Sequence, residues 1–240
     1  MVEENPTRAP RIIDCAELRE RIAVFRGREE AGRVLAGLLA REQRHLSRPL
    51  LLAIPSGGVP VALAAAGVLG WPLDIAPVSK ITLPWNSEAG YGAVAFDGTV
   101  RLNEPLLSRL PLTRAMVEEG IAQTRQKVQR RLRALRGDRP PLERVIPGHD
   151  AILVDDGLAS GFTMLAAVEA VRHCDPASVS IAVPTGSRET VERLAGEVDR
   201  VWCCNIRSGY PFAVADAYRN WYDLTEEEVL ALLETSAGST

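Results

Sequence analysis

Residues 151–164 read AILVDDGLASGFTM. An apolar run leads into two adjacent acids, Asp155 and Asp156, and then into a loop of small residues that contains Ser160 and Thr163. Apolar residues resume after the loop, with the composition of a buried helix. The stretch therefore predicts a buried strand, a polar loop and the first turn of a helix, as in a βαβ unit.

The same alternation extends outward from this stretch in both directions. Toward the C-terminus, a helix-like RETVERLAGEV separates the strand-like segments SVSIAVPTGS and RVWCCNI. Toward the N-terminus, RPLLLAIP is strand-like, VPVALAAAGVLG is a small apolar helix, and WPLDIAPVSKI is a second strand. Strands that alternate with helices predict an α/β fold, a doubly wound and mostly parallel sheet with helices on both faces.

Three further segments have local signatures. LPWNSEAGYGAVAFDGTVRLN is rich in turn residues and predicts a mobile loop followed by a hairpin. LTRAMVEEGIAQTRQKVQRRLRALRG predicts a long polar helix that ends at Gly137, and its basic run at 125–136 is typical of a solvated helix face. Thr225 and Glu228 form a capping box before a terminal helix.

Composition limits the function classes. The 240 residues are 46% hydrophobic with a formal net charge of −3, which predicts one domain or one domain with an appendage. We place the domain at residues 25–240, behind a leader at 1–24. The near-neutral charge argues against a nucleic-acid partner, and the lack of a long apolar run argues against a membrane partner. The four cysteines form no CxxC pair, and the start does not resemble a secretory signal, so we expect a cytoplasmic protein.

The loop after the acids has the chemistry of a sugar-phosphate site. Ligands of parallel α/β sheets bind beyond the carboxyl ends of the strands, where Asp155 and Asp156 stand. Backbone N–H groups at a helix N-terminus hold a phosphate, with help from the hydroxyls of Ser160 and Thr163. The acids are suited to accept hydrogen bonds from sugar hydroxyls or to bind Mg²⁺ through water. A phosphate, a diol and a cation describe a phosphorylated ribose.

AILVDDGLASGFTM resembles the phosphoribosyl-pyrophosphate (PRPP) signature of type I phosphoribosyltransferases. Over roughly residues 25–233 the chain resembles a subgroup described as predicted phosphoribosyltransferases. The resemblance rests on FRGREEAGRVLAGLL, LAIPSGGVPVALAAAGVLGWPLDI, SKITLPWNSEAGYGAVAFDG, AILVDDGLASGFTMLAAVEAVR, AVPTGSRETVERL and YRNWYDLTEEEVLALL. It implies a fold with a small hood and a flexible loop, Mg²⁺ as cofactor, PRPP and a small acceptor as substrates, and a homodimer.

The resemblance also implies roles for individual residues. Asp155 and Asp156 would hold the ribose hydroxyls and, through these or through water, the Mg²⁺; together with Lys80 they form the catalytic set. The 5′-phosphate would lie in the loop formed by Ala159, Ser160, Gly161, Phe162 and Thr163. Pyrophosphate would lie at Ser56, Gly57, Gly58 and Lys80.

Two further regions complete the expected site. Residues 82–96 would form the flexible loop that closes over the reaction centre and excludes water. Arg207, Tyr210 and Phe212 are candidates for a hood over the acceptor through stacking and a carbonyl contact, and a packing role for the three is the alternative.

The chain departs from the subgroup's pattern near the pyrophosphate. Ser56 stands where the subgroup commonly has Arg, Ser79 precedes Lys80 in place of an Arg, and Phe162 replaces a small residue. The expected function is transfer of phosphoribosyl from PRPP to a small nitrogenous base. The alternatives are a PRPP- or nucleotide-binding regulatory protein with weakened catalysis, and hydrolysis of a related sugar phosphate.

Overall fold

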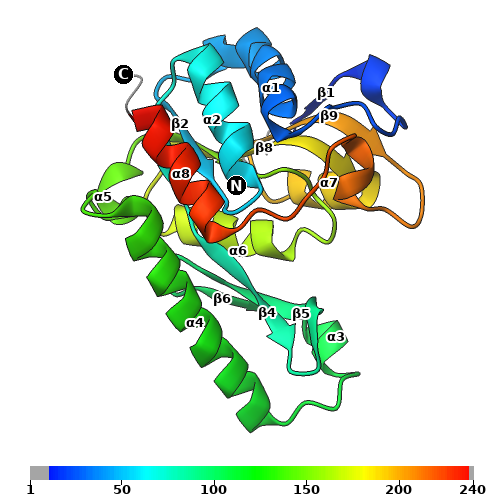
Figure 1. The fold of residues 1–240 in the computed structure, drawn as a ribbon, viewed down its shortest axis with the longest axis vertical. Coiled ribbons are helices and arrows are strands. Elements are labelled where there is room, and N and C mark those ends of the chain that lie inside the picture. Colours follow the sequence, from blue (N-terminus) through cyan, green and yellow to red (C-terminus); the bar gives the residue numbers. More distant parts are fainter. Residues whose placement is uncertain (1–10, 238–240) are drawn as a thin grey trace, which may run out of the picture.

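A computed structural model describes residues 11–237 of the chain (Figure 1). Six parallel strands form the main sheet in the order β1-β9-β8-β7-β2-β3. Their bounds are Arg11–Asp14 (β1), Arg200–Arg207 (β9), Ser178–Ser187 (β8), Asp150–Val154 (β7), Pro49–Ala53 (β2) and Leu73–Ile75 (β3). The predicted α/β fold class, a doubly wound parallel sheet, is confirmed.

Helices cover both faces of this sheet. One face packs against α1, α2 and α8, and the other against α5, α6 and α7. The bounds are Arg28–Glu42 (α1), Gly58–Leu69 (α2), Glu226–Ala237 (α8), Leu142–Val145 (α5), Phe162–Arg172 (α6) and Arg188–Ala195 (α7). Along β7, Ala151 and Leu153 face one cluster while Ile152 and Val154 face the other, so every residue of this strand is buried. A strand buried on both faces reads as a continuous apolar run.

A second sheet projects from the main body, below it in Figure 1. It contains β4 (Val78–Leu83), β5 (Asn86–Ala95) and β6 (Val100–Leu102), all antiparallel. Residues 82–96, the expected flexible loop, therefore consist mainly of the β4–β5 hairpin. The long helix α4 (Arg114–Arg136) packs along this sheet. It begins after its N-cap Thr113 and ends at Gly137, so the predicted long polar helix is confirmed.

The segment WPLDIAPVSKI is not one strand. It divides into β3, which pairs with β2 in the main sheet, and β4, which leaves for the second sheet. Pro77 separates the two, and proline has no N–H to donate to a sheet. Because the chain leaves the main sheet at Pro77, β4 and its residue Lys80 lie next to α4.

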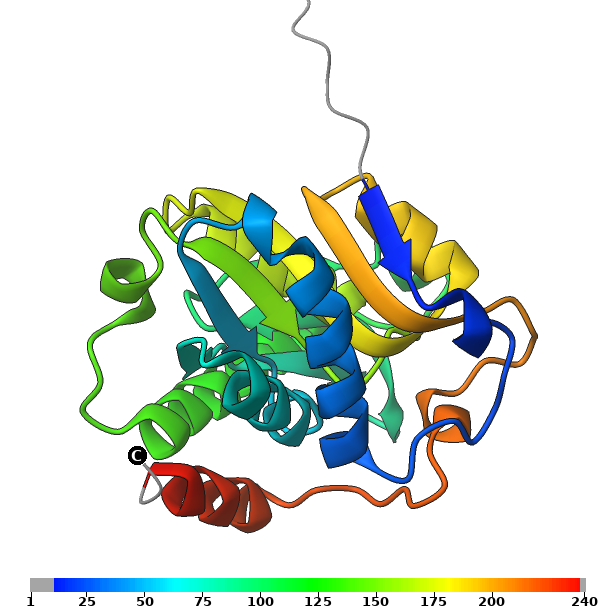
Figure 2. The same ribbon diagram turned by 90° about the horizontal axis from the view of Figure 1, so that it is seen from above.

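The expected leader lies partly outside the described residues, at 1–10. Its described part includes β1, an edge strand that pairs in parallel with β9 (Figure 2). Short elements complete the fold: Ala16–Leu18 (η1), Gln43–His45 (η2), Glu104–Leu107 (α3) and Val214–Ala217 (η3). None of the helices within residues 11–237 is long and apolar enough to cross a lipid bilayer.

Candidate active site

The two acids stand at the carboxyl end of β7, where the strand gives way to a turn. The backbone N–H of Asp156 donates to Asp155 Oδ1 at 2.8 Å, and Tyr218 Oη donates to the backbone carbonyl of Asp156 at 2.6 Å. These bonds fix the strand end in a bent conformation. Both acids follow the last residue of β7 and so stand at the carboxyl edge of the sheet, where Asp155 lines a cavity and Asp156 contacts Arg28.

Arg28, the first residue of α1, holds the second acid. Its Nε lies 2.8 Å from Asp156 Oδ2, and its Nη1 donates to the carbonyl of Tyr222 at 2.8 Å. The guanidinium carbon lies 4.0 Å from the Trp221 ring centroid, which adds a cation–π contact. The Arg28 side chain is 8% exposed and that of Asp156 is 15% exposed, so this is a buried ion pair.

The pKa values of both acids are raised. Burial raises the pKa of Asp155 well above its ordinary value, and the neighbouring charge of Asp156 raises it further. Burial also raises the pKa of Asp156, but the Arg28 guanidinium opposes this increase. Asp155 therefore retains a proton more readily than Asp156, because only Asp156 has a directly bonded cation.

The turn before α2 lies against the acids. A Cβ on Gly57 would fall 1.9 Å from Asp156 Oδ2, and one on Gly58 would fall 2.4 Å from the carbonyl oxygen of Val154. Any larger side chain at these positions would displace the strand end or the carboxylate. The two glycines therefore allow the backbone of this turn to touch the acidic pair, and the structure brings together two segments about a hundred residues apart in the sequence.

The small-residue loop is anchored on its outer side. The N–H of Leu158 donates to Thr185 O at 2.9 Å, and the carbonyls of Ala159 and Ser160 accept from Thr190 Oγ1 and Arg193 Nη2. Gly161, with φ of +69°, is the N-cap of α6 and has no side chain to satisfy the first helical turn. The first N–H groups of a helix lack intrahelical partners, so this turn is suited to bind an anion.

A cavity of about 280 Å³ lies between the two sheets. It brings Asp155 and Thr163 together with Lys80 on β4, and α4 closes another side with Lys127 and Arg131. The remaining lining residues are Ile54, Pro55, Val78, Ser79 and Thr82. This cavity therefore unites predicted ribose, phosphate and pyrophosphate residues.

A second, larger cavity of about 800 Å³ lies on the other side of the loop. The three hood candidates, Arg207, Tyr210 and Phe212, line it together with Ala159, Ser160 and Phe162. The Arg207 guanidinium carbon lies 4.4 Å from the Phe212 ring centroid, and Tyr210 is 98% exposed. The structure thus places the hood candidates beside the loop but in a different cavity from Lys80 and Asp155.

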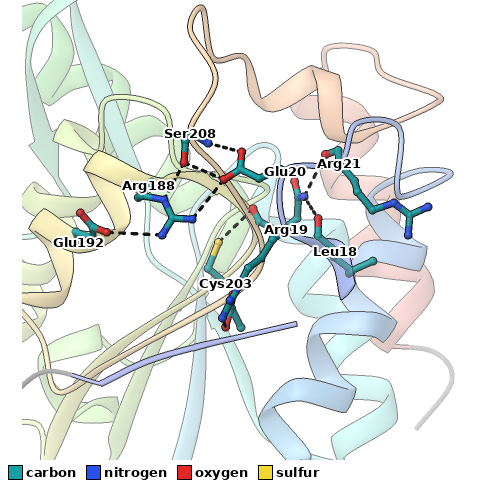
Figure 3. Close-up of polar contacts among 10 residues, drawn as sticks. Leu18, Arg19, Glu20, Arg21, Arg188, Glu192, Cys203 and Ser208 are labelled. Carbon is teal, nitrogen blue, oxygen red and sulfur yellow. Dashed lines mark hydrogen bonds and ion pairs between the residues drawn. The ribbon is translucent and has the colours of Figure 1, made fainter. Parts of the chain in front are cut away.

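The N-terminal segment anchors the start of the hood region. Figure 3 shows the Glu20 carboxylate between Ser208 and Arg188. It accepts from the N–H and the hydroxyl of Ser208, each at 2.8 Å, and from Arg188 Nη2 at 3.3 Å. The N–H of Ser208 is the main reason that the pKa of Glu20 is lowered.

The acidic pair fits an indirect magnesium site better than a direct one. Two carboxylates at a strand end are the hard oxygen donors that Mg²⁺ prefers. Arg28 already occupies one oxygen of Asp156, and among the side chains that the structure describes no three of His, Cys, Asp or Glu gather as metal ligands. Binding through water or a ribose hydroxyl therefore matches these residues.

Sequence reasoning missed Arg28, Lys127 and Arg131. A positively charged residue at the first position of a helix is unfavourable, because the N-terminal end of the helix dipole is also positive. This unusual position was the one feature of the sequence that could have indicated a special role for Arg28. Lys127 and Arg131 belong to the basic run expected to be a solvated face. Their spacing of four residues indicates a shared side of the helix but not what that side faces.

Residues 97–217 match the family described as "Phosphoribosyl transferase domain". Two Mycobacterium tuberculosis proteins, from strains H37Rv and CDC 1551, are each 36% identical to this chain over 213 residues, which is 88% of this chain and 46% of theirs. They are named "Putative phosphoribosyl transferase" Rv0571c and MT0597. The chain spans about half the length of these curated relatives.

A solved structure shares both sequence and fold. The crystal structure of TT1426 from Thermus thermophilus is 36% identical, with a TM-score of 0.68. The match covers 87% of this chain and 97% of that one, so the similarity extends far beyond the loop at 159–163.

Proposed function

The chain belongs to the phosphoribosyltransferase family, and from this membership we propose that it transfers the 5-phosphoribosyl group of PRPP to a small acceptor, a nitrogenous base, with release of pyrophosphate. One observation carries the proposal. The turn at 56–58, the acids Asp155 and Asp156, and the loop at 159–163 meet at the carboxyl edge of one parallel sheet. A donor that combines a phosphate, a ribose and a pyrophosphate matches these three neighbouring features in chemistry.

In the proposed reaction, the bond from ribose C1 to the pyrophosphate oxygen breaks as a bond from C1 to the acceptor nitrogen forms. The nitrogen then loses its proton to solvent, and pyrophosphate leaves with the bonding electrons. Asp155 and Asp156 bind the ribose hydroxyls, and the amides at the start of α6 bind the 5′-phosphate. The chain contributes mainly positioning and charge, since no covalent intermediate is required.

Mg²⁺ belongs to the proposal as a cofactor. Asp155 and Asp156 would hold it through water or through ribose hydroxyls, as their geometry allows. When bound, it supplies positive charge to the departing pyrophosphate. Lys80 adds a cation to the lining of the small cavity.

The larger cavity is the proposed acceptor site. Phe212 and Tyr210 offer aromatic faces for stacking on a flat base, and Arg207 stacks on Phe212. Phe162 also lines this cavity, so one of the three residues that depart from the subgroup's pattern lies on the proposed acceptor side, whereas Ser79 lines the small cavity. We include a homodimer and a cytoplasmic site of action in the proposal on the basis of the resemblance alone.

The second candidate is a PRPP- or nucleotide-binding regulatory protein. Ser56 and Ser79 favour it, because neither brings a cation to the pyrophosphate turn. Ser79 is 4% exposed and its hydroxyl has no hydrogen-bond partner among the described residues. Such a protein would bind the donor without turning it over.

An assay of pyrophosphate release distinguishes the candidates. We expect release from PRPP and Mg²⁺ only when a suitable base from a panel is added. The double variant Asp155→Asn, Asp156→Asn should lower the rate by about a hundred-fold or more, because both ribose contacts lose a carboxyl group. Asp138→Asn, an exposed change, should leave the rate unaltered.

Each failure of that assay has a distinct meaning. If the protein binds PRPP but releases no pyrophosphate with any acceptor of the panel, the regulatory protein is favoured. Release that needs no acceptor would indicate hydrolysis. Equal rates in the double variant and the wild type would contradict the assignment of the acids.

A further inference from the structure

Helix α4 brings two cations to the small cavity. Lys127 and Arg131 are four residues apart, about one turn, and both line the cavity wall. Between them Val128 packs into the cluster that joins α4 to the second sheet. The buried Val128 therefore fixes the rotation of α4 about its axis. In that orientation Lys127 and Arg131, which flank Val128 in the sequence, lie at the cavity.

Arg131 touches the turn before α2 directly. Its Nη2 donates to Ser56 Oγ at 3.3 Å, and its Nε lies 3.2 Å from Glu226 Oε2 on α8. The Arg131 side chain is only 16% exposed. Glu226 thus holds one edge of the guanidinium, while the other edge is presented to the turn.

The charges around the cavity are mostly positive. Three cations line it, Lys80, Lys127 and Arg131, against one lining acid, Asp155, and Glu226, which pairs with Arg131. Burial, followed by the charge of Arg131, lowers the pKa of Lys127, as expected for a lysine beside another cation. The turn itself, Ser56-Gly57-Gly58, has no charged side chain. An anion in this cavity would therefore draw its counter-charge from α4 and β4.

We propose that Lys127 and Arg131 form the cationic subsite that binds the diphosphate group of the donor. The inference rests on the proposed function, since it concerns the leaving group of the same reaction. A diphosphate carries several negative charges, and an arginine fork binds phosphate oxygens through two N–H groups at once. Helix α4 then belongs to the binding site, and its two cations supply the positive charge that the side chains of the turn at 56–58 lack.

Calorimetric titration with inorganic pyrophosphate tests the subsite without any need for turnover. Lys127→Gln and Arg131→Gln should each weaken binding about ten-fold, and the double variant about a hundred-fold. Arg131→Lys keeps the charge but loses the fork, so it should bind more tightly than Arg131→Gln. Arg125→Gln, an exposed change on the same helix, should bind like the wild type. Ribose 5-phosphate affinity should stay within about two-fold in all variants.

The subsite is overturned if the double variant, folded as judged by circular dichroism and melting temperature, binds pyrophosphate as tightly as the wild type. It is also overturned if the wild type does not bind pyrophosphate. If binding falls as expected but the wild type never releases pyrophosphate from PRPP, the subsite stands and the transferase proposal fails. If the wild type and the double variant turn over PRPP equally, transfer stands and the subsite fails.

Discussion

At the scale of single residues, Asp156 connects distant parts of the chain. It receives Arg28 from α1, the backbone of Gly57 from the turn before α2, and the hydroxyl of Tyr218 on its carbonyl. The carboxylate is confined by Arg28 and Gly57 and the backbone carbonyl by Tyr218, so the residue has little freedom to move. The site is therefore preorganised by contacts between segments that are far apart in the sequence.

Gly57→Ala tests the contact between the turn and the acid. The added methyl would meet Asp156 Oδ2 at 1.9 Å, so the carboxylate must shift from its position. We expect PRPP affinity to fall at least about ten-fold in a calorimetric titration. Gly67→Ala in α2, where a methyl meets nothing within 4 Å, should keep the affinity and slightly stabilise the helix. Equal affinities in the two variants would contradict the contact.

Arg28→Met tests the buried ion pair. Removing the guanidinium leaves Asp156 buried without its cation and strips a donor from the Tyr222 carbonyl. The free energy of unfolding should drop by about 3–5 kcal/mol in urea denaturation. The matched change Arg33→Met breaks an exposed pair with Glu29 and should cost less than about 1 kcal/mol. A drop of similar size in both variants would show that burial of the pair is unimportant.

At the scale of elements, α4 is fixed at two points. Near its C-terminus, Arg136 makes two hydrogen bonds of 2.8 Å to the Asp74 carboxylate on β3. Nearer the N-terminus of α4, Gly120 lies against the buried ring of Tyr91 on β5. The first contact ties the helix to the main sheet and the second ties it to the projecting sheet. Together they hold the cationic side of α4 over the cavity.

Gly120→Ala tests the second contact. A methyl at this position would lie 2.3 Å from Tyr91 Oη, and the tyrosine is 1% exposed, so it has no room to retreat. The steric cost, about 1–3 kcal/mol, should exceed the gain of about 1 kcal/mol from better helix propensity. Thermal or urea unfolding should therefore report a destabilised variant. In a double-mutant cycle, Tyr91→Phe should recover part of the loss; an additive result would mean that the two residues do not clash.

At the scale of the whole molecule, the two ends of the main sheet have separate roles. The candidate site occupies the carboxyl ends of the strands. At the amino ends, Asp150 accepts from Ser178 Oγ at 2.6 Å and from the N–H groups of Ser47 and Arg48 at 2.7 and 2.9 Å. This carboxylate joins the starts of β2, β7 and β8. We therefore expect Asp150 to affect stability but not ligand binding.

The pH dependence of stability tests that role. Burial alone would raise the pKa of Asp150, but the bonds from Ser178, Arg48 and Ser47 outweigh it, so the pKa is lowered. A lowered pKa adds stability at neutral pH that is lost as the pH falls below the unfolded value, near about 4. Asp150→Asn should therefore be less stable than the wild type at pH 7, and the gap should narrow on acidification. A difference in unfolding free energy between the variant and the wild type that stays constant down to a pH of about 2.5 would contradict the stabilising role of the Asp150 carboxylate.

The sequence predicted the parts of this molecule that depend on local pattern. The βα order and the loop at 155–163 are readable because strand burial, small loop residues and helix periodicity lie within one short window. The strand Arg11–Asp14 is too short to stand out, and it exists only because β9 offers it an edge. The pairing of Arg28 with Asp156 spans 128 residues, and the cavity-facing side of α4 depends on tertiary packing. No local signal specifies either.

Binding of PRPP is the measurement that tests the central claim most directly. PRPP would be titrated into the protein with and without Mg²⁺, beside ribose 5-phosphate and AMP. The account predicts Mg²⁺-dependent binding of PRPP at least about ten-fold tighter than that of ribose 5-phosphate, because the turn at 56–58 and α4 add contacts to the diphosphate. Equal affinity for PRPP and ribose 5-phosphate, with or without Mg²⁺, would contradict a site built around a pyrophosphate leaving group.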